Sequence, residues 1–135
     1  MPPSGRHHVV RREGFMTTPH GRVMFIAAHP DDPDFLAGGT VARLAKEGRE
    51  DGELEDTRDL RRDVTREMRR WRPDLIITLS PHRTHNDFPG WHRDHRITGR
   101  VVLDCVYPLA RDHLAFPELP REYEPHGVRE LYCIQ

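Results

Sequence analysis

Two short, almost unbroken apolar runs constrain the fold of this chain more than any other feature. Residues 22–28 (RVMFIAA) end at a His-Pro-Asp-Asp-Pro string, and residues 74–80 (DLIITLS) are dominated by Leu and Ile. Strands that are buried on both faces have such runs, and they occur in parallel sheets whose faces are covered by helices. The sequence therefore predicts an α/β fold with a parallel sheet and flanking helices.

Three stretches have apolar residues at helical spacing. Residues 35–47 are expected to form a helix that packs on the first strand. Thr57 is placed to cap a second helix, which Pro73 ends, and a third helix is expected to begin near Arg93 and to end at Pro108. The apolar positions are, in chain order, Leu36, Val41, Leu44 and Ala45; Leu60, Val64, Met68 and Trp71; and Ile97, Val101, Val102, Cys105 and Val106.

The remaining segments are interpreted as loops or edges. Residues 81–91 are expected to form a loop and residues 111–127 a proline-rich excursion, and residues 128–134 are expected to form a last strand at an edge. Residues 1–19 mix Pro, Gly, Arg and His without a period, so we expect a disordered or mis-annotated extension there. A partial domain over residues 20–135 is then predicted.

Composition excludes several classes of partner. The 21 basic residues are offset by 22 acidic ones, so a net charge of −1 gives no reason to expect nucleic acid or an anionic membrane. No apolar run approaches the ~20 residues of a membrane span, and the first residues lack the apolar stretch of a signal peptide. The two cysteines resemble small buried residues, which suits the cytoplasm. The oligomeric state is left open.

Two polar clusters follow the two apolar runs. His29, Asp31 and Asp32 come directly after the first, and His92 and its neighbours come at the junction of the later loop and helix. Ligands in an open parallel sheet bind beyond the carboxyl ends of its strands, so we expect both clusters at one edge. The members of the second cluster are His92, Asp94 and His95.

The residue types in these clusters point to a metal-dependent hydrolase. His29, Asp32 and His95 would offer two imidazoles and a carboxylate, a set that suits Zn²⁺, and also Fe²⁺, while leaving positions open for water and substrate. Asp31 could take a proton from the water as general base. His92 could donate to a developing oxyanion or a leaving group. Asp94 could hold the His92 ring in one tautomer.

Simpler interpretations of the same residues stay open. An Asp-Asp pair after a strand often caps a helix or forms a turn, and a His-x-x-His pair often lies on a solvated surface. The conjunction of both clusters at strand ends favours function. His82 and His85 fit no ligand spacing and are not assigned. Gly38 and Gly39 would let the chain approach the first strand closely.

The motifs resemble those of a known family, the PIG-L/LmbE-like zinc-dependent N-deacetylases. The resemblance rests on Ala28-His29-Pro30-Asp31-Asp32, Gly38-Gly39-Thr40 and Trp91-His92-Arg93-Asp94-His95-Arg96. It implies a Rossmann-like α/β fold and removal of the N-acetyl group from an amino-sugar conjugate such as an N-acetylglucosamine derivative. It also implies the roles given above: metal ligands His29, Asp32 and His95, general base Asp31, and acid His92 with its partner Asp94.

The resemblance is interrupted. After the first helix, family members continue through a second strand, a substrate-contacting helix and a third strand. In this sequence the chain instead passes straight from Gly48-Arg49-Glu50 to Asp51-Gly52-Glu53-Leu54. We therefore expect an internal deletion, together with a C-terminal truncation at Gln135. Two alternatives to the deacetylase follow: a non-catalytic remnant or fragment that keeps metal binding without turnover, and a hydrolase of another ester or amide.

Overall fold

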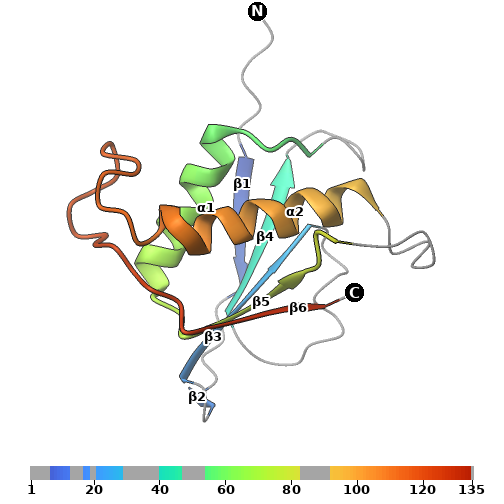
Figure 1. Ribbon diagram of the computed structural model, residues 1–135, viewed down its shortest axis with the longest axis horizontal. Helices are drawn as coiled ribbons and strands as arrows, with labels where there is room; N and C mark the ends of the chain where they lie inside the picture. Colours follow the sequence, from blue (N-terminus) through green and yellow to red (C-terminus); the bar gives the residue numbers. More distant parts are fainter. Residues whose placement is uncertain are drawn as a thin grey trace, which may run out of the picture.

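A computed structural model of the chain describes residues 7–12, 17–18, 21–28, 40–46, 54–82 and 92–134 (Figure 1). Its elements are, in chain order, β1 (His7–Arg12), β2 (Thr17–Thr18), β3 (Gly21–Ala27), β4 (Thr40–Lys46), α1 (Arg58–Trp71), β5 (Leu75–Leu79), α2 (Arg93–Asp104), the π-helical turn η3 (Cys105–Leu109) and β6 (Glu130–Ile134).

The strands form a mixed sheet in the order β1-β4-β3-β5-β6, and β2 pairs with β3. The four strands β4, β3, β5 and β6 run parallel, whereas β1 runs antiparallel to β4 at one edge. Both helices lie in front of the sheet in Figure 1. The predicted α/β class, with a parallel sheet and flanking helices, is confirmed, and so is the last strand at the edge opposite β1.

The hydrophobic core lies between the sheet and the two helices. Met24 and Ile26 of β3 and Ile76 of β5 face the helices and are fully buried. Burying a side chain of this size contributes about 1.5–3 kcal/mol, so this layer dominates the stability of the fold. The helical positions predicted to be apolar supply the other half of the core: Leu60, Val64, Met68, Val101, Val102 and Cys105 are buried, and Trp71, Ile97 and Val106 pack against them.

Local signals in the sequence set the ends of α1. The hydroxyl oxygen of Thr57 accepts a hydrogen bond from the Leu60 amide at 3.1 Å, so Thr57 is the N-cap that the sequence predicts. At the other end Arg72 adopts a left-handed conformation (φ 50°) and its amide donates to the Met68 carbonyl. Pro73 follows and prevents the helix from continuing.

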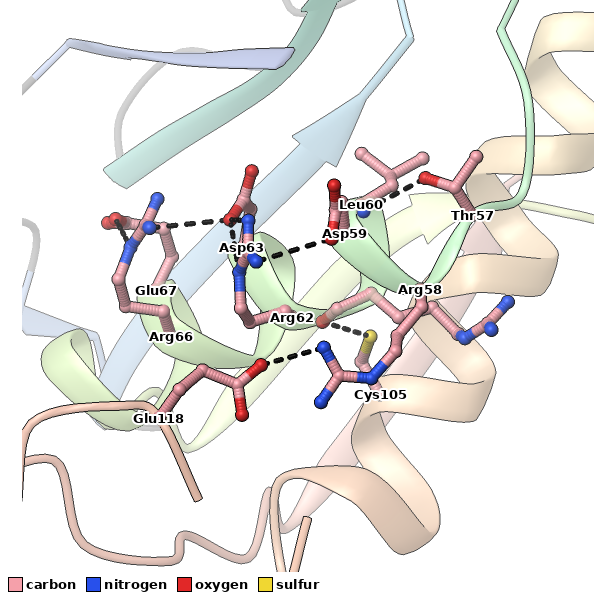
Figure 2. A network of polar contacts seen from close by, with 11 residues as sticks. Thr57, Arg58, Asp59, Leu60, Arg62, Asp63, Arg66, Glu67, Cys105 and Glu118 are labelled. Atoms are coloured by element: carbon pink, nitrogen blue, oxygen red, sulfur yellow. Dashed lines mark hydrogen bonds and ion pairs between the residues drawn. The ribbon is translucent and has the colours of Figure 1, made fainter. Parts of the chain in front are cut away.

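Charged side chains form a network along α1 (Figure 2). Arg62 lies 3.2 Å from Asp59 and 3.1 Å from Asp63, and Arg66 lies 3.3 Å from Asp63. The two pairs that join residues three positions apart, Arg62 with Asp59 and Arg66 with Asp63, contribute about 0.3–0.5 kcal/mol each. The network therefore supports the helix and adds little to the overall stability.

The expected helix over residues 35–47 is wrong where the structure describes it. Residues 40–46 form β4, which pairs in parallel with β3 on one side and antiparallel with β1 on the other. Ala, Leu, Arg and Lys favour a helix locally, but this preference is a fraction of a kilocalorie per residue. Hydrogen-bonding partners on both edges of the segment override it.

The amino-terminal strands lie within residues 1–19, which the sequence analysis placed outside the fold. β1 pairs with β4 over its whole length, from His7 opposite Lys46 to Arg12 opposite Val41. Pairing with a distant segment leaves no local period to detect. The boundary at residue 19 stays a prediction.

The chain after α2 turns at Pro108 and then runs as an excursion without helix or strand until β6. The buried guanidinium of Arg69 holds its beginning, donating to the carbonyls of Leu109, Ala110, Asp112 and Ala115 at 2.7–3.4 Å. Across the described residues, no helix has the length and apolar character needed to cross a membrane.

Candidate active site

The carboxyl ends of β3 and β5 form the edge at which the sequence places its two polar clusters. The strands are neighbours in parallel register, with Ile26 opposite Thr78. The buried hydroxyl of Thr78 donates a hydrogen bond to the Ile26 carbonyl at 3.0 Å. This bond joins β3 to β5 close to the end of β3. Ala28, two residues after Ile26, is the last described residue before His29.

Helix α2 approaches the same edge through Gly99. A Cβ atom on this glycine would overlap the carbonyl oxygen of Leu79 and would lie 2.8 Å from the backbone nitrogen of Pro81. The helix can therefore pack against the end of β5 only because position 99 has no side chain. This contact directs the first turn of α2 to the carboxyl edge of the sheet.

His92 is the N-cap of α2. Its Nδ1 atom accepts a hydrogen bond from the backbone amide of Asp94 at 3.0 Å, a role that Ser, Thr or Asp usually fills. A neutral imidazole that accepts at Nδ1 carries its proton on Nε2. The cap thus fixes both the orientation of the half-buried ring and the nitrogen that can donate.

His95 lies beside His92 on the first turn of α2. The two ring centroids are 5.5 Å apart and the ring planes are inclined by 31°. His95 is half-buried. The structure therefore brings together the two histidines that the sequence singled out, at the predicted edge of the sheet.

Asp94 points its carboxylate toward the segment that leads into α1. The side chain is buried, and its Oδ1 atom accepts a hydrogen bond from the amide of Leu54 at 3.3 Å. Arg93 donates to the carbonyl of the same residue, and its guanidinium lies 3.8 Å from the Asp94 carboxylate. The amide and the carbonyl of Leu54 are thereby both held by the start of α2. A further role of Asp94 toward the His92 ring stays a prediction.

The first polar cluster lies outside the described residues, and so do Gly38, Gly39 and His85. Among the residues that the structure describes, no three His, Cys, Asp or Glu side chains gather closely enough to hold a metal ion. Two of the three predicted ligands, His29 and Asp32, are not among those residues. The described member of the set, His95, fits a metal ligand chemically because it is a half-buried imidazole next to a second one.

His82 follows the end of β5 and is exposed. Its backbone amide donates to the Ser80 hydroxyl oxygen at 3.3 Å, while that hydroxyl donates to the His82 carbonyl at 3.1 Å. This is a local turn after β5, in agreement with the loop expected there. The structure gives no reason to add His82 to the ligand set.

Sequence reasoning missed two groups at this edge. The contacts of Leu54 join residues about 40 positions apart, and no local pattern could have shown them. By contrast, the arginines of α2 recur at positions 93, 96 and 100, a spacing that places them along one side of a helix and that could have been recognised in the sequence.

Comparisons of the sequence with known proteins find one family and a deacetylase. The family described as PIG-L, GlcNAc-PI de-N-acetylase, matches residues 49–106. A 1D-myo-inositol 2-acetamido-2-deoxy-alpha-D-glucopyranoside deacetylase from Segniliparus rotundus is 63% identical over 27 residues, which cover 20% of this chain and 8% of the relative.

Two solved structures share the fold. The conserved protein TT1542 from Thermus thermophilus has a TM-score of 0.57 at 20% identity, covering 81% of this chain and 63% of its own. The N,N'-diacetylchitobiose deacetylase from Pyrococcus horikoshii has a TM-score of 0.56 at 17% identity, covering 72% of this chain and 53% of its own. The chain spans less than two thirds of the length of each of these relatives.

Proposed function

We propose that this chain, which matches the PIG-L family over residues 49–106, removes the N-acetyl group from an amino-sugar conjugate by metal-dependent hydrolysis. The observation that carries the proposal is the pairing of His92 and His95, 5.5 Å apart, on the helix turn at the carboxyl edge of the sheet. That edge is where an open parallel sheet binds ligands. The relatives that are named as deacetylases support the same reaction.

The metal would be held by His29, Asp32 and His95. Two imidazoles and one carboxylate suit Zn²⁺, and Fe²⁺ accepts the same donors. When bound, such an ion polarises an amide carbonyl and acidifies a coordinated water. The cytoplasmic location expected from the cysteines belongs to this proposal as well.

The protein side chains would then move the protons. Asp31 accepts a proton from the water that attacks the acetamide carbonyl. The Nε2–H group of His92 donates to the oxygen on which negative charge develops and then protonates the departing amine as the bond between carbon and nitrogen breaks. The two protons of the water restore His92 and complete the protonation of the amine, so one water and one acetamide give acetate and an ammonium group. The N-cap contact supports this role because it leaves the proton of His92 on Nε2.

The first test measures metal content and acetate release from N-acetylglucosamine conjugates with the purified chain. We expect about one equivalent of metal. His95→Ala should lose both metal and acetate release. His92→Gln should keep the metal but release acetate roughly 100-fold more slowly or worse, in the range typical for removal of a general acid or an oxyanion donor.

His113→Ala is the matched control, because His113 is exposed in the excursion after α2. It should retain the metal and the activity of the parent. If the parent binds metal but releases no acetate from any amino-sugar conjugate, the deacetylase proposal fails and the non-catalytic remnant takes its place. If acetate comes only from other amides or esters, the substrate class is wrong.

A further inference from the structure

A cavity of about 600 Å³ lies along the outer side of α2, next to the residues that follow β5. Arg93, Arg96 and Arg100 line it from the helix, and Pro81 lines it from the end of β5. The three arginines are three and four residues apart, so they follow one another along the same side of the helix. We call this cavity the arginine groove.

The positive charge of the arginine groove is concentrated toward the amino end of α2. Arg93 is already engaged with the Leu54 carbonyl and lies 3.8 Å from Asp94, so its charge is partly balanced. The groove also has an acidic lining residue, Asp104, but this lies one turn beyond Arg100 at the far end of the helix. The partial positive charge at the helix amino terminus adds to the same end. The half of the groove near the histidines therefore attracts anions.

The arginine groove lies close to the candidate active site. Arg96 lies one helical turn after His92, with its amide donating to the His92 carbonyl at 3.2 Å, and Arg100 lies four residues farther along α2, which is about 6 Å along the helix axis. Ile97 lines the groove as well and offers an apolar contact between the two arginines. A molecule that has its acetamido group at the histidines and extends along α2 would meet Arg96 and then Arg100.

We propose that the arginine groove is a subsite for an anionic group, a phosphate or a carboxylate, that the substrate carries beyond its acetamido sugar. Guanidinium groups bind such oxyanions with two parallel hydrogen bonds, and they stay charged at every physiological pH. Arg96 and Arg100 are the binding residues, and they select anionic over neutral conjugates. This inference rests on the proposed function for the identity of the sugar, but the binding of the anion can be measured without turnover.

The test is isothermal titration calorimetry on the full chain with four probes. These are N-acetylglucosamine, N-acetylglucosamine 1-phosphate, the carboxylate-bearing N-acetylmuramic acid, and inorganic phosphate. At least one anionic sugar should bind ten times or more as tightly as N-acetylglucosamine, and the phosphate and carboxylate arms show which anion the groove prefers. Arg100→Gln should abolish most of this preference. Arg121→Gln, which removes the same charge from an exposed site in the excursion, should keep it.

Two results would overturn the subsite. The first is equal affinity for neutral and anionic sugars. In that case acetate release would still support the proposed deacetylase reaction, because that reaction does not depend on the groove. The second is binding of inorganic phosphate as tight as that of the sugar phosphate, because the groove would then serve a free anion. Conversely, tight binding of an anionic sugar that depends on Arg100, without acetate release from any substrate, supports the groove and rejects the proposed reaction.

Discussion

Cys105, the first residue of η3, is fully buried against α1 (Figure 2), and its thiol donates to the Arg61 carbonyl at 3.4 Å. Burial raises the pKa of this thiol to about 12 from an ordinary value of 9.0. The folded protein therefore keeps the proton at a pH where the unfolded chain loses it. The contribution of Cys105 to stability is complete below pH 9 and is lost as the pH rises from 9 toward 12.

We predict that the free energy of unfolding falls by about 2 kcal/mol between about pH 8 and pH 10.5 through this group alone. Urea unfolding at several pH values measures it. Cys105→Ala should start from a lower stability and should lose correspondingly less over the same range, since the titrating group is gone. Cys133→Ala, at an exposed position on β6, should stay closer to the parent than Cys105→Ala does, although burial raises the pKa of the Cys133 thiol as well. Equal slopes for the parent and for Cys105→Ala would contradict the prediction.

Helix α2 depends on a close contact with β5 that one methyl group would break. In Gly99→Ala the added Cβ would overlap the Leu79 carbonyl oxygen, which is backbone and cannot move aside without shifting the strand. We expect α2 to be displaced, with a loss of about 1–3 kcal/mol in stability from overpacking. We also expect roughly a tenfold or greater loss of acetate release, since His92 and His95 move with the helix.

Gly127→Ala provides the comparison for this variant. A Cβ at position 127 would lie 3.5 Å from the Arg111 side chain, which is ordinary contact distance. Its melting temperature and its activity should match those of the parent. If Gly99→Ala behaves in the same way as Gly127→Ala, the close approach does not position the site.

The elements that sequence reasoning could predict are those with strong local signals. β3 and β5 have continuous apolar runs, and α1 has both a cap at Thr57 and a stop at Pro73. The residues of β4 favour a helix locally, and only the neighbouring strands decide otherwise. Local periodicity thus determines the elements of the core, whereas pairing between distant segments determines those at the β1 edge.

The candidate site was predictable to a similar extent. The residue types and their position after a predicted strand were enough to predict that His92 and His95 lie close together at one edge of the sheet. The direction of the Asp94 carboxylate, toward Leu54, depends on how the segment before α1 packs against α2. Such a contact arises only in the folded molecule, so a sequence pattern could not have contained it.

Outside the hydrophobic core, Arg69 of α1 joins the excursion after η3 to the rest of the molecule. Its buried guanidinium donates to four carbonyls between Leu109 and Ala115, and burial lowers its pKa from the usual value, although the group stays charged. In Arg69→Met these carbonyls would lose a charged donor. We predict a loss of roughly 3 kcal/mol, seen as a fall in Tm on the order of 10 °C by circular dichroism.

The neighbouring Arg70→Met variant controls for the loss of a positive charge on α1. Arg70 is exposed and lies 5.4 Å from the ring of Trp71. Its replacement should change Tm by no more than a few degrees. Similar melting temperatures for the two variants would show that the excursion after η3 does not depend on Arg69.

The contact between α2 and the peptide of Leu54 has a consequence for how the site can be observed. The Leu54 amide lies outside any helix or strand, yet it is shielded from solvent by its bond to the Asp94 carboxylate. Hydrogen exchange at this amide requires its bond to Asp94 to break, through opening of either the start of α2 or the segment before α1. A single backbone proton, far from the histidines in sequence, therefore reports in solution how often the contact between these two segments opens.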